Sequence, residues 1–246
     1  MKSLFCAAVG LFALAAGGAP VLAQQNDWDY EGTIYLFMPE TTTSISTPVQ
    51  TLDGRLSFSD ALSNLDLAFM GAVGASNGRW SFFLDYMYTD LSFSSPPPNP
   101  SFSNVDTAVT TQILNGYAAY RVYDEPTVQI DLAAGFRWFD AKSTMSLQPV
   151  PPGVIASVDE SWINPVIGLR AQLQFSDRWA GTAFFDYGGF ESGEETWQAL
   201  LTADYELNDN WVLRGGYRYI TFDHATATGS FSFTQSGPIF GATYRF

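Results

Sequence analysis

The sequence is poor in the residue types that most metal, redox and nucleic-acid functions require. Its 246 residues include one cysteine, one histidine and two lysines. A single cysteine cannot form a disulfide within the chain, and one cysteine with one histidine excludes the common zinc patterns. Only 11 basic residues stand against 25 acidic ones. Because binding to phosphates requires lysine and arginine, we expect no nucleic acid among the partners.

Long hydrophobic runs are missing beyond the N-terminus. Residues 1–23 combine a positive charge at Lys2, an apolar stretch and the small-residue exit VLA, which together predict a secretory signal peptide. Cys6 lies at the start of the apolar stretch rather than after it, which disfavours a lipoprotein. No later segment approaches the ~20 apolar residues of a transmembrane helix. The exported chain is therefore expected either to be soluble or to cross a membrane with strands.

Residues 24–246 show strand-like alternation with no linker, which predicts one domain. Short polar turns at 76–79, 124–126, 176–178 and 208–210 alternate with longer polar stretches at 39–64, 94–104 and 143–159. Four turns and two termini at one end predict ten antiparallel strands, most of them as long as the ~9 to 11 residues that cross a bilayer. The expected strands are 28–38, 65–77, 80–93, 105–122, 127–142, 161–175, 179–190, 196–207, 211–222 and 232–246.

The two faces of these strands differ in composition. One face is almost entirely apolar and has aromatic residues near both ends, as the two interfaces of a bilayer select. These are Trp28, Trp80, Trp179 and Trp211 near the turns, and Tyr88, Trp138, Trp197 and Tyr219 near the loops. The opposite face mixes small residues with charges of both signs. Its charges include Asp85, Arg121, Asp131, Arg137, Arg170, Asp186, Asp204, Arg214 and Arg218.

Alternation alone does not say which face points inward, so a soluble barrel with an apolar lumen is the alternative. A soluble exterior is usually rich in lysine and glutamate. After residue 23 the chain has only Lys142, which favours the charged face as the interior. The predicted fold is all-β: a transmembrane, antiparallel, up-and-down β-barrel of ten strands, or of eight as an alternative, with short turns at one end and longer loops at the other.

The leader, the alternating strands and the ending GPIFGATYRF resemble small outer-membrane β-barrel proteins of Gram-negative bacteria, in the broad company of the OmpA and OmpW types. The segments FMPE and SFSDALSNLDLAFMGAV strengthen this resemblance, which covers residues 24–246. It implies an outer-membrane location, with short periplasmic turns, longer extracellular loops, and outer-membrane lipid and lipopolysaccharide as partners. It also implies that Tyr244 and Phe246 belong to the signal read by the barrel-assembly machinery.

The lumen charges suggest two functions. A barrel of eight strands is filled by its side chains and one of sixteen encloses an aqueous channel, so ten strands leave at most a narrow path. Paired charges would then hold a structural barrel together, or line a narrow pore for small solutes. Two loop segments would suit a surface ligand: a short helix over 59–65 with a serine N-cap, and the polyproline-like 94–100.

His224 offers an alternative function, an outer-membrane protease or lipid-modifying enzyme. Asp223 cannot easily orient it, because adjacent residues of a strand point to opposite faces, so a partner such as Glu160, Glu191 or another loop acid is needed. A solvated histidine is the more ordinary interpretation, and we expect no enzyme and no cofactor. Loose calcium binding by an acidic rim is a further hypothesis, with Glu191, Glu194 and Glu195 as the candidate ligands.

Overall fold

The structure, a computed structural model, describes residues 28–46, 51–95, 104–148, 155–226 and 229–246. The predicted signal peptide and residues 96–100 of the proline-rich segment lie outside these ranges. The strands are β1 (Asp29–Phe37), β2 (Glu40–Ser46), β3 (Thr51–Leu56), β4 (Leu65–Ser76), β5 (Trp80–Ser95), β6 (Asn104–Glu125), β7 (Val128–Gln148), β8 (Ile155–Gln174), β9 (Trp179–Gly188), β10 (Glu194–Glu206), β11 (Trp211–Thr226) and β12 (Gly229–Arg245).

Ten of these strands close an antiparallel barrel, so the predicted fold class is confirmed. The order runs from β1 through β4 to β12, and β12 pairs back onto β1. In the closing pair Ile34 lies opposite Ala242 and Glu31 opposite Arg245. The backbone N–H of Phe246 donates to the carbonyl of Tyr30 at 3.0 Å. The last residue of the chain thus belongs to the closed sheet.

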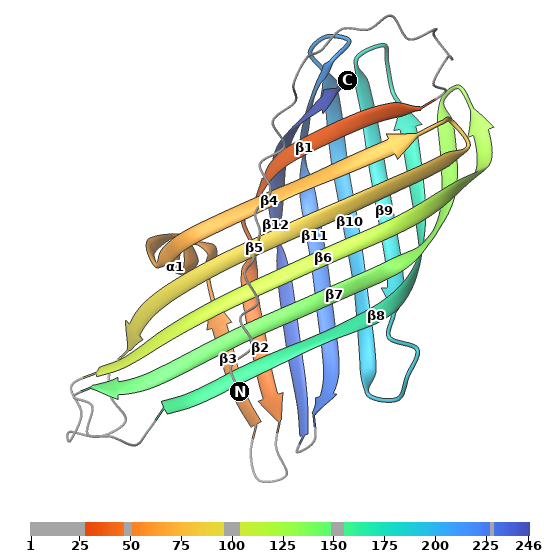
Figure 1. Ribbon diagram of the computed structural model, residues 1–246. Helices are drawn as coiled ribbons and strands as arrows, with labels where there is room; N and C mark the ends of the chain where they lie inside the picture. The colour runs from red at the N-terminus through yellow and green to blue at the C-terminus, as the bar shows by residue number, and fades with distance from the viewer. Residues whose placement is uncertain (1–27, 47–50, 96–103, 149–154, 227–228) are drawn as a thin grey trace, which may run out of the picture.

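Asparagine side chains shape two of the tight turns. Asn77 Oδ1 accepts hydrogen bonds from the backbone N–H groups of Arg79 and Trp80 at 3.1 and 2.8 Å. Asn208 Oδ1 does the same for the two residues that lead into β11. Such side-chain turns explain why an asparagine precedes a strand-initial tryptophan in both places. These turns define the turn end of the barrel, at the top of Figure 1, and the longer connections define the loop end.

The predicted loop over residues 39–64 is wrong, because most of it is ordered structure. Strands β2 and β3 form a hairpin that extends the sheet beside the loop-end half of β12, over Ser230–Ser236. A short helix, α1 (Phe58–Ser63), follows. Its N-cap is Ser57, whose Oγ accepts from the N–H of Asp60 at 3.2 Å, so the helix begins before the predicted Ser59.

The predicted loop over residues 143–159 is also largely strand. Strands β7 and β8 continue to pair as far as Ser146 opposite Ile155. Polar residues such as Ser143, Thr144 and Ser146 gave this stretch the composition of a loop, while its backbone pairing continues. Strands β5 to β8 are therefore long, and Figure 1 shows them reaching far toward the loop end.

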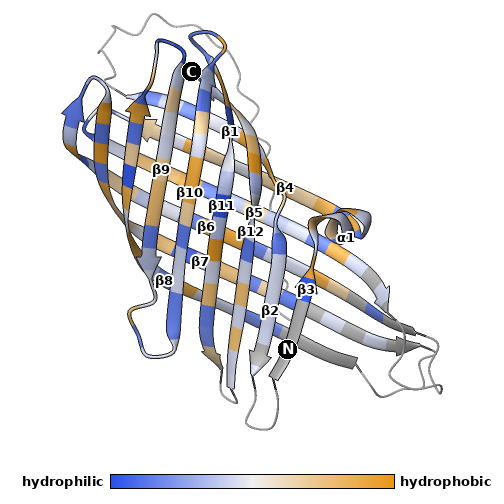
Figure 2. Ribbon diagram, turned by 180° about the vertical axis from the view of Figure 1, so that it is seen from behind, coloured by the Kyte–Doolittle hydropathy of each residue, from blue (hydrophilic) through white to orange (hydrophobic). Residues whose placement is uncertain are grey.

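The outer surface of the barrel is a belt of exposed apolar side chains. Ile34 is 72% exposed, and Figure 2 shows hydrophobic and hydrophilic residues alternating along the strands. Aromatic rings pair at the turn end: Trp80 with Tyr120 at 4.9 Å and Trp211 with Tyr244 at 5.0 Å between centroids. Toward the loop end Trp197 stacks on Tyr219 at 4.4 Å. Among the described residues no helix is long and apolar enough to span a bilayer.

Candidate functional site

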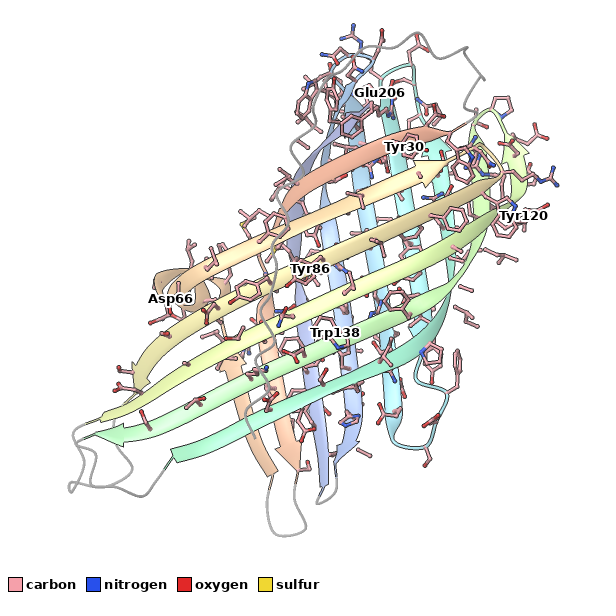
Figure 3. The ribbon with its side chains drawn as sticks, in the orientation of Figure 1. Tyr30, Asp66, Tyr86, Tyr120, Trp138 and Glu206 are labelled. Atoms are coloured by element: carbon pink, nitrogen blue, oxygen red, sulfur yellow. The ribbon has the colours of Figure 1, made fainter. Side chains whose placement is uncertain are left out.

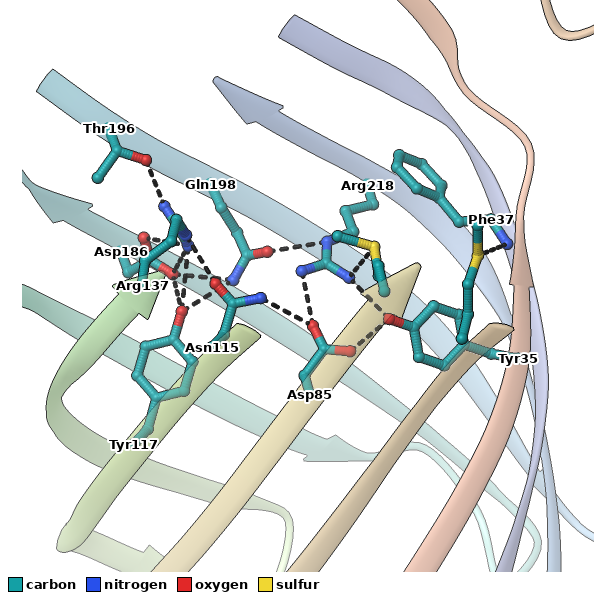
Figure 4. Close-up of polar contacts among 12 residues, drawn as sticks. Tyr35, Phe37, Asp85, Asn115, Tyr117, Arg137, Asp186, Thr196, Gln198 and Arg218 are labelled. Atoms are coloured by element: carbon teal, nitrogen blue, oxygen red, sulfur yellow. Dashed lines mark hydrogen bonds and ion pairs between the residues drawn. The ribbon is translucent and has the colours of Figure 1, made fainter. Parts of the chain in front are cut away.

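A closed ring of polar side chains crosses the middle of the lumen (Figure 4). We call it the lumen ring; its members come from six different strands. They are Asp85, Asn115, Arg137, Asp186, Gln198 and Arg218. Two ion pairs, each 2.7 Å long, are linked at both sides by an amide side chain. Each amide donates to one carboxylate and accepts from one guanidinium, which closes the ring.

The first ion pair is completely enclosed. Arg137 and Asp186 are both 0% exposed, and the guanidinium also donates to Asn115 Oδ1 at 2.7 Å and Thr196 Oγ1 at 2.8 Å. Asp186 accepts from the hydroxyl of Tyr117 at 2.6 Å. Burial of two charges is costly unless nearly every donor and acceptor has a partner, and here that condition is met.

The second ion pair joins distant parts of the chain. Arg218 Nη2 donates to Asp85 Oδ2 at 2.7 Å, and Arg218 Nε donates to Gln198 Oε1 at 2.8 Å. The hydroxyl of Tyr35 donates to Asp85 and accepts from Arg218. Through this tyrosine the first strand of the barrel is tied to the ring.

On the loop-end side of the ring the lumen is filled by an apolar plug. Phe139 lies at its centre, with ring centroids of Trp162 and Phe222 at 4.6 Å and of Phe233 at 5.2 Å. All of these side chains belong to the inward parity of their strands. The buried members of the plug are Phe37, Met70, Met87, Ile113, Phe139, Ile220, Phe222, Phe233 and Ile239. Ring and plug together occupy the lumen from its middle toward its loop end.

On the turn-end side the lumen widens into a cavity of about 660 Å³, which we call the turn-end vestibule. It extends from Arg218 in the ring to Asn210 in the last turn. Small side chains leave this space unfilled; they include Thr33, Ala72, Gly74, Ser81, Thr182 and Thr202. The contrast with the loop-end side follows from side-chain volume, because both halves are built from inward-facing positions.

The remaining predicted lumen charges lie around the vestibule. Asp131 accepts from Arg121 Nε at 2.5 Å and from Arg170 Nε at 2.8 Å, so one carboxylate serves two guanidinium groups. Arg214 has only distant partners: its Nη2 lies 3.5 Å from Glu31 and its Nε 3.9 Å from Asp204. Near the turn end Arg245 pairs with Glu206 at 2.7 Å, and Glu206 is labelled in Figure 3.

His224 lies inside the loop-end mouth, not on a free loop. Its ring stacks on Trp162 at 4.2 Å with an interplanar angle of 5°, and its Nδ1 lies 2.5 Å from Glu194 Oε1. Asn164 Nδ2 donates to the other oxygen of Glu194 at 3.3 Å. Glu194 is therefore the carboxylate that reaches this histidine, in place of Glu160, Glu191 or the neighbouring Asp223.

The loop between β9 and β10 borders this mouth. Gly189 and Gly193 have φ angles of 78° and 84°, which other residues rarely adopt. A Cβ atom at Gly193 would lie 2.6 Å from Cβ of Ala225, so glycine also allows the loop to lie close against β11. Within the described part of the chain, no three histidine, cysteine, aspartate or glutamate side chains are grouped to hold a metal ion, Glu191, Glu194 and Glu195 included.

The belt and terminal residues lie on the outer side of the wall. The ring centroids of Trp28 and Phe82 lie 5.8 Å apart, and those of Trp179 and Tyr205 lie 4.8 Å apart. Phe246 is 79% exposed. Figure 3 shows Tyr30 and Tyr120 near the turn end, with Tyr86 and Trp138 farther toward the loop end. Trp138 donates from Nε1 to Ser161 Oγ at 2.9 Å, and Tyr88 lies opposite Phe69 on β4.

Sequence reasoning missed the uncharged members of the lumen ring and the apolar plug. Asn115 and Gln198 are inward by parity, as is their neighbour Tyr117, but a neutral side chain carries no signal of which charge it will meet. The plug did leave a signal: apolar residues such as Met87 and Phe139 occupy the charged parity, two residues from Asp85 and Arg137 in the direction of the loop end. The plug could have been found by counting the apolar residues of the inward parity at each level between the turn end and the loop end.

No protein-family model matches the chain, and no curated protein sequence matches it. Among solved structures, the outer membrane protease OmpT from Escherichia coli is similar, with a TM-score of 0.60 and 11% identity over 92% of this chain and 99% of that one. The translocator domain of the autotransporter NalP from Neisseria meningitidis has a TM-score of 0.48 and 14% identity, over 91% of this chain and 90% of that one. Identities this low establish a similar fold and nothing more. Of the two comparisons, only that with OmpT, at a TM-score of 0.60, supports the fold assignment. With its closed ten-strand sheet, the chain has the fold of the small Gram-negative outer-membrane β-barrels.

Proposed function

We propose that this protein is an integral outer-membrane barrel with a closed lumen, which has a structural role or acts through its loop end on other surfaces. The lumen ring carries this proposal. A conducting path needs water along its whole length, and at mid-height the ring, with its fully buried pair of Arg137 and Asp186, occupies the lumen. The apolar plug adds a second obstruction on the loop-end side of the ring.

Conductance of the refolded barrel in planar bilayers tests the closure directly. We expect no steady conductance steps from the wild-type protein in concentrated KCl. Insertion is verified on the same preparation by a heat-modifiable shift on a denaturing gel, which folded barrels give. Steady open-state conductance from inserted wild-type protein would overturn the closed-lumen proposal in favour of a narrow, charge-lined pore for small solutes.

The proposal places the turn end in the periplasm and the loop end outside the cell, with outer-membrane lipid and lipopolysaccharide around the apolar belt. Since Cys6 is the sole cysteine, single-cysteine labelling is clean. With a membrane-impermeant maleimide, Ser192→Cys at the loop end should react on intact cells. Asp209→Cys at the turn end should react only after the outer membrane is permeabilised. The reverse pattern would contradict this orientation.

We further propose that the barrel-assembly machinery reads the closing strand, with Tyr244 and Phe246 as its outward signal. Deletion of Phe246 should reduce the amount of folded barrel in the outer membrane at least several-fold. Phe240→Ala, another outward aromatic on β12, is the matched control and should assemble normally. Equal assembly of the deletion and the wild-type chain would contradict this role.

A second candidate function rests on His224 and Glu194. A histidine next to a carboxylate is the arrangement of a general base, and the E. coli protein with the same fold is named a protease. The pair lies beside a pocket that Glu195, Asp223 and Ser232 also line. Stacking on Trp162 is the structural alternative for this histidine.

Hydrolysis of quenched fluorescent peptides and of lipid ester substrates by the refolded barrel tests this candidate. If the pair is catalytic, His224→Gln and Glu194→Gln should each lower activity at least about 100-fold. Asp223→Asn is the matched control, because its side chain meets Ser232 instead. Full activity in His224→Gln, or none in the wild-type barrel, would exclude this candidate.

A further inference from the structure

The turn-end vestibule contains a cation whose hydrogen-bonding capacity is only partly used. Arg214 Nε is buried and makes no hydrogen bond to any described residue. The carboxylate nearest to this nitrogen, 3.9 Å away on Asp204, already accepts from Thr182 at 2.8 Å and from Thr202 at 2.9 Å, and Glu31 lies 3.5 Å from Nη2. By contrast, Arg137 donates to partners from all three of its nitrogens. Arg214 is thus weakly paired, and because its side chain is 28% exposed and lines the cavity, its guanidinium can still donate to a ligand.

Further positive charge lines the same cavity. Arg121 and Arg170 both pair with the carboxylate of Asp131, Arg121 also pairs with the exposed Asp124, and both arginines face the vestibule. Of the acids nearer the mouth, Asp29 and Asp209 are exposed, and Glu31, 37% exposed, lies 3.5 Å from Arg214. Water screens exposed charges far more than charges held in a confined cavity. An anion inside the vestibule would thus meet guanidinium groups more strongly than it meets the acids of the mouth.

The floor of the vestibule is apolar and aromatic. Phe83 stacks on Tyr117 at 4.7 Å and meets Phe184 edge-on at 5.8 Å. The guanidinium of Arg170 lies 5.4 Å from the centroid of Phe83, so cation and aromatic face adjoin. Leu200 completes this surface beneath the small side chains of the walls. A ligand that fits would carry a flat or short apolar body next to a negative group.

We propose that the turn-end vestibule binds a small amphipathic anion, such as an aryl or short acyl carboxylate, with its negative group on Arg214 and its apolar body on the Phe83–Phe184 floor. The cavity volume of about 660 Å³ lies within the ~300 to 1,000 Å³ of small-molecule sites. Entry is from the turn end, because the lumen ring closes the other side. The ligand thus binds without crossing the barrel.

Titration of 2-naphthoate into the full barrel in lipid nanodiscs, with empty nanodiscs as the partition control, tests this site. We expect saturable one-to-one binding that weakens at least tenfold in Arg214→Gln. Arg178→Gln is the matched control: it removes the same charge from an exposed turn at the same end, outside the vestibule lining, and should bind as the wild type does. The neutral isostere 2-naphthalenemethanol should bind at least tenfold more weakly than the acid.

A second variant tests the same site in case Arg214→Gln does not fold. Ala72→Phe puts a large side chain into the vestibule without removing a charge, and its folding is verified by the heat-modifiable gel shift. It should abolish 2-naphthoate binding. Retained binding in folded Ala72→Phe, equal affinity of Arg214→Gln and wild type, or no binding above empty nanodiscs would each overturn the proposal.

Competition identifies the source of the anion. Displacement of 2-naphthoate by octanoate alone assigns the site to free small acids. Displacement by lysophosphatidylglycerol as well adds single-chain lipids that enter through the turn end. Both results support the shared chemistry, whereas displacement by neither would contradict it.

Discussion

The two halves of the lumen are built from the same inward-facing positions and yet have opposite contents. On the loop-end side large apolar side chains such as Phe139 and Phe222 fill the space. On the turn-end side small residues leave a cavity lined by arginines, of which Arg214 is only weakly paired. The lumen ring separates the halves. The difference suggests that the loop-end half provides stability and closure, while the turn-end half retains room for a ligand.

The largest expected effect is at the ring. Arg137→Ala leaves Asp186 buried without its cation, which should destabilise the barrel by about 3 to 5 kcal/mol. The double variant Arg137→Met/Asp186→Leu should recover most of that loss, because it removes both charges. Reversible urea unfolding in lipid vesicles measures both. If Arg137→Ala were as stable as the wild type, the ion pairs of the ring would not contribute to the stability of the barrel.

The plug is expected to be almost as sensitive. Phe222→Ala removes a fully buried ring that touches Phe139 and Phe233, and the cavity should cost about 3 kcal/mol. Phe82→Ala, on the outer face, is the size-matched control and should cost less, because lipid fills the space that the lost ring leaves and no cavity remains. The same unfolding assay applies. Equal losses would mean that the plug is no better packed than the outer wall.

A smaller effect is expected from the walls of the vestibule. Thr182→Val keeps the side-chain volume but removes the hydroxyl that donates to Asp204, which should cost about 1 kcal/mol. Asp204 retains its bond from Thr202, so the carboxylate is not left without a partner. Losses above about 3 kcal/mol would place this wall in the same class as the ring.

The smallest effect is expected at the mouth. Arg245→Gln breaks the pair with Glu206, whose side chains are 43% and 35% exposed, and should cost less than about 1 kcal/mol. Raising the salt concentration to 1 M should erase most of this difference, because exposed pairs are screened. The cost of Arg137→Ala should persist in the same salt. If the cost of Arg245→Gln did not change with salt, the pair at the mouth would behave like the buried pair in the ring.

The sequence predicted the wall of the barrel better than it predicted the contacts inside the lumen. The wall followed from parity and turns: Trp80, Trp211 and Phe246 lie outward, and the closing pair of β1 and β12 formed as expected. Hairpin pairing is local, so turn residues fix its register. The hairpin was missed because β2 is mostly serine and threonine and shows no apolar face, and β3 is only six residues long.

Contacts across the lumen were beyond the sequence. Which inward side chains meet depends on the tilt and stagger of all ten strands, and no single hairpin contains that information. Asp85 and Arg218 are 133 residues apart, and the amides that link the ion pairs look like any other polar inward residue. The partner of His224 was likewise undetermined, because Glu194 reaches it only through the pairing of β10 with β11.

The lumen ring also has a consequence for the order of assembly. Its members come from strands throughout the chain, and Tyr35 on β1 contacts Arg218 on β11. The ring therefore needs β5 and β11 to face each other across the lumen, and its bonds to Tyr35 also need β1 in place. Until these strands meet, the charges on either side have only water as a partner, so closing the ring and removing that water are one event in assembly.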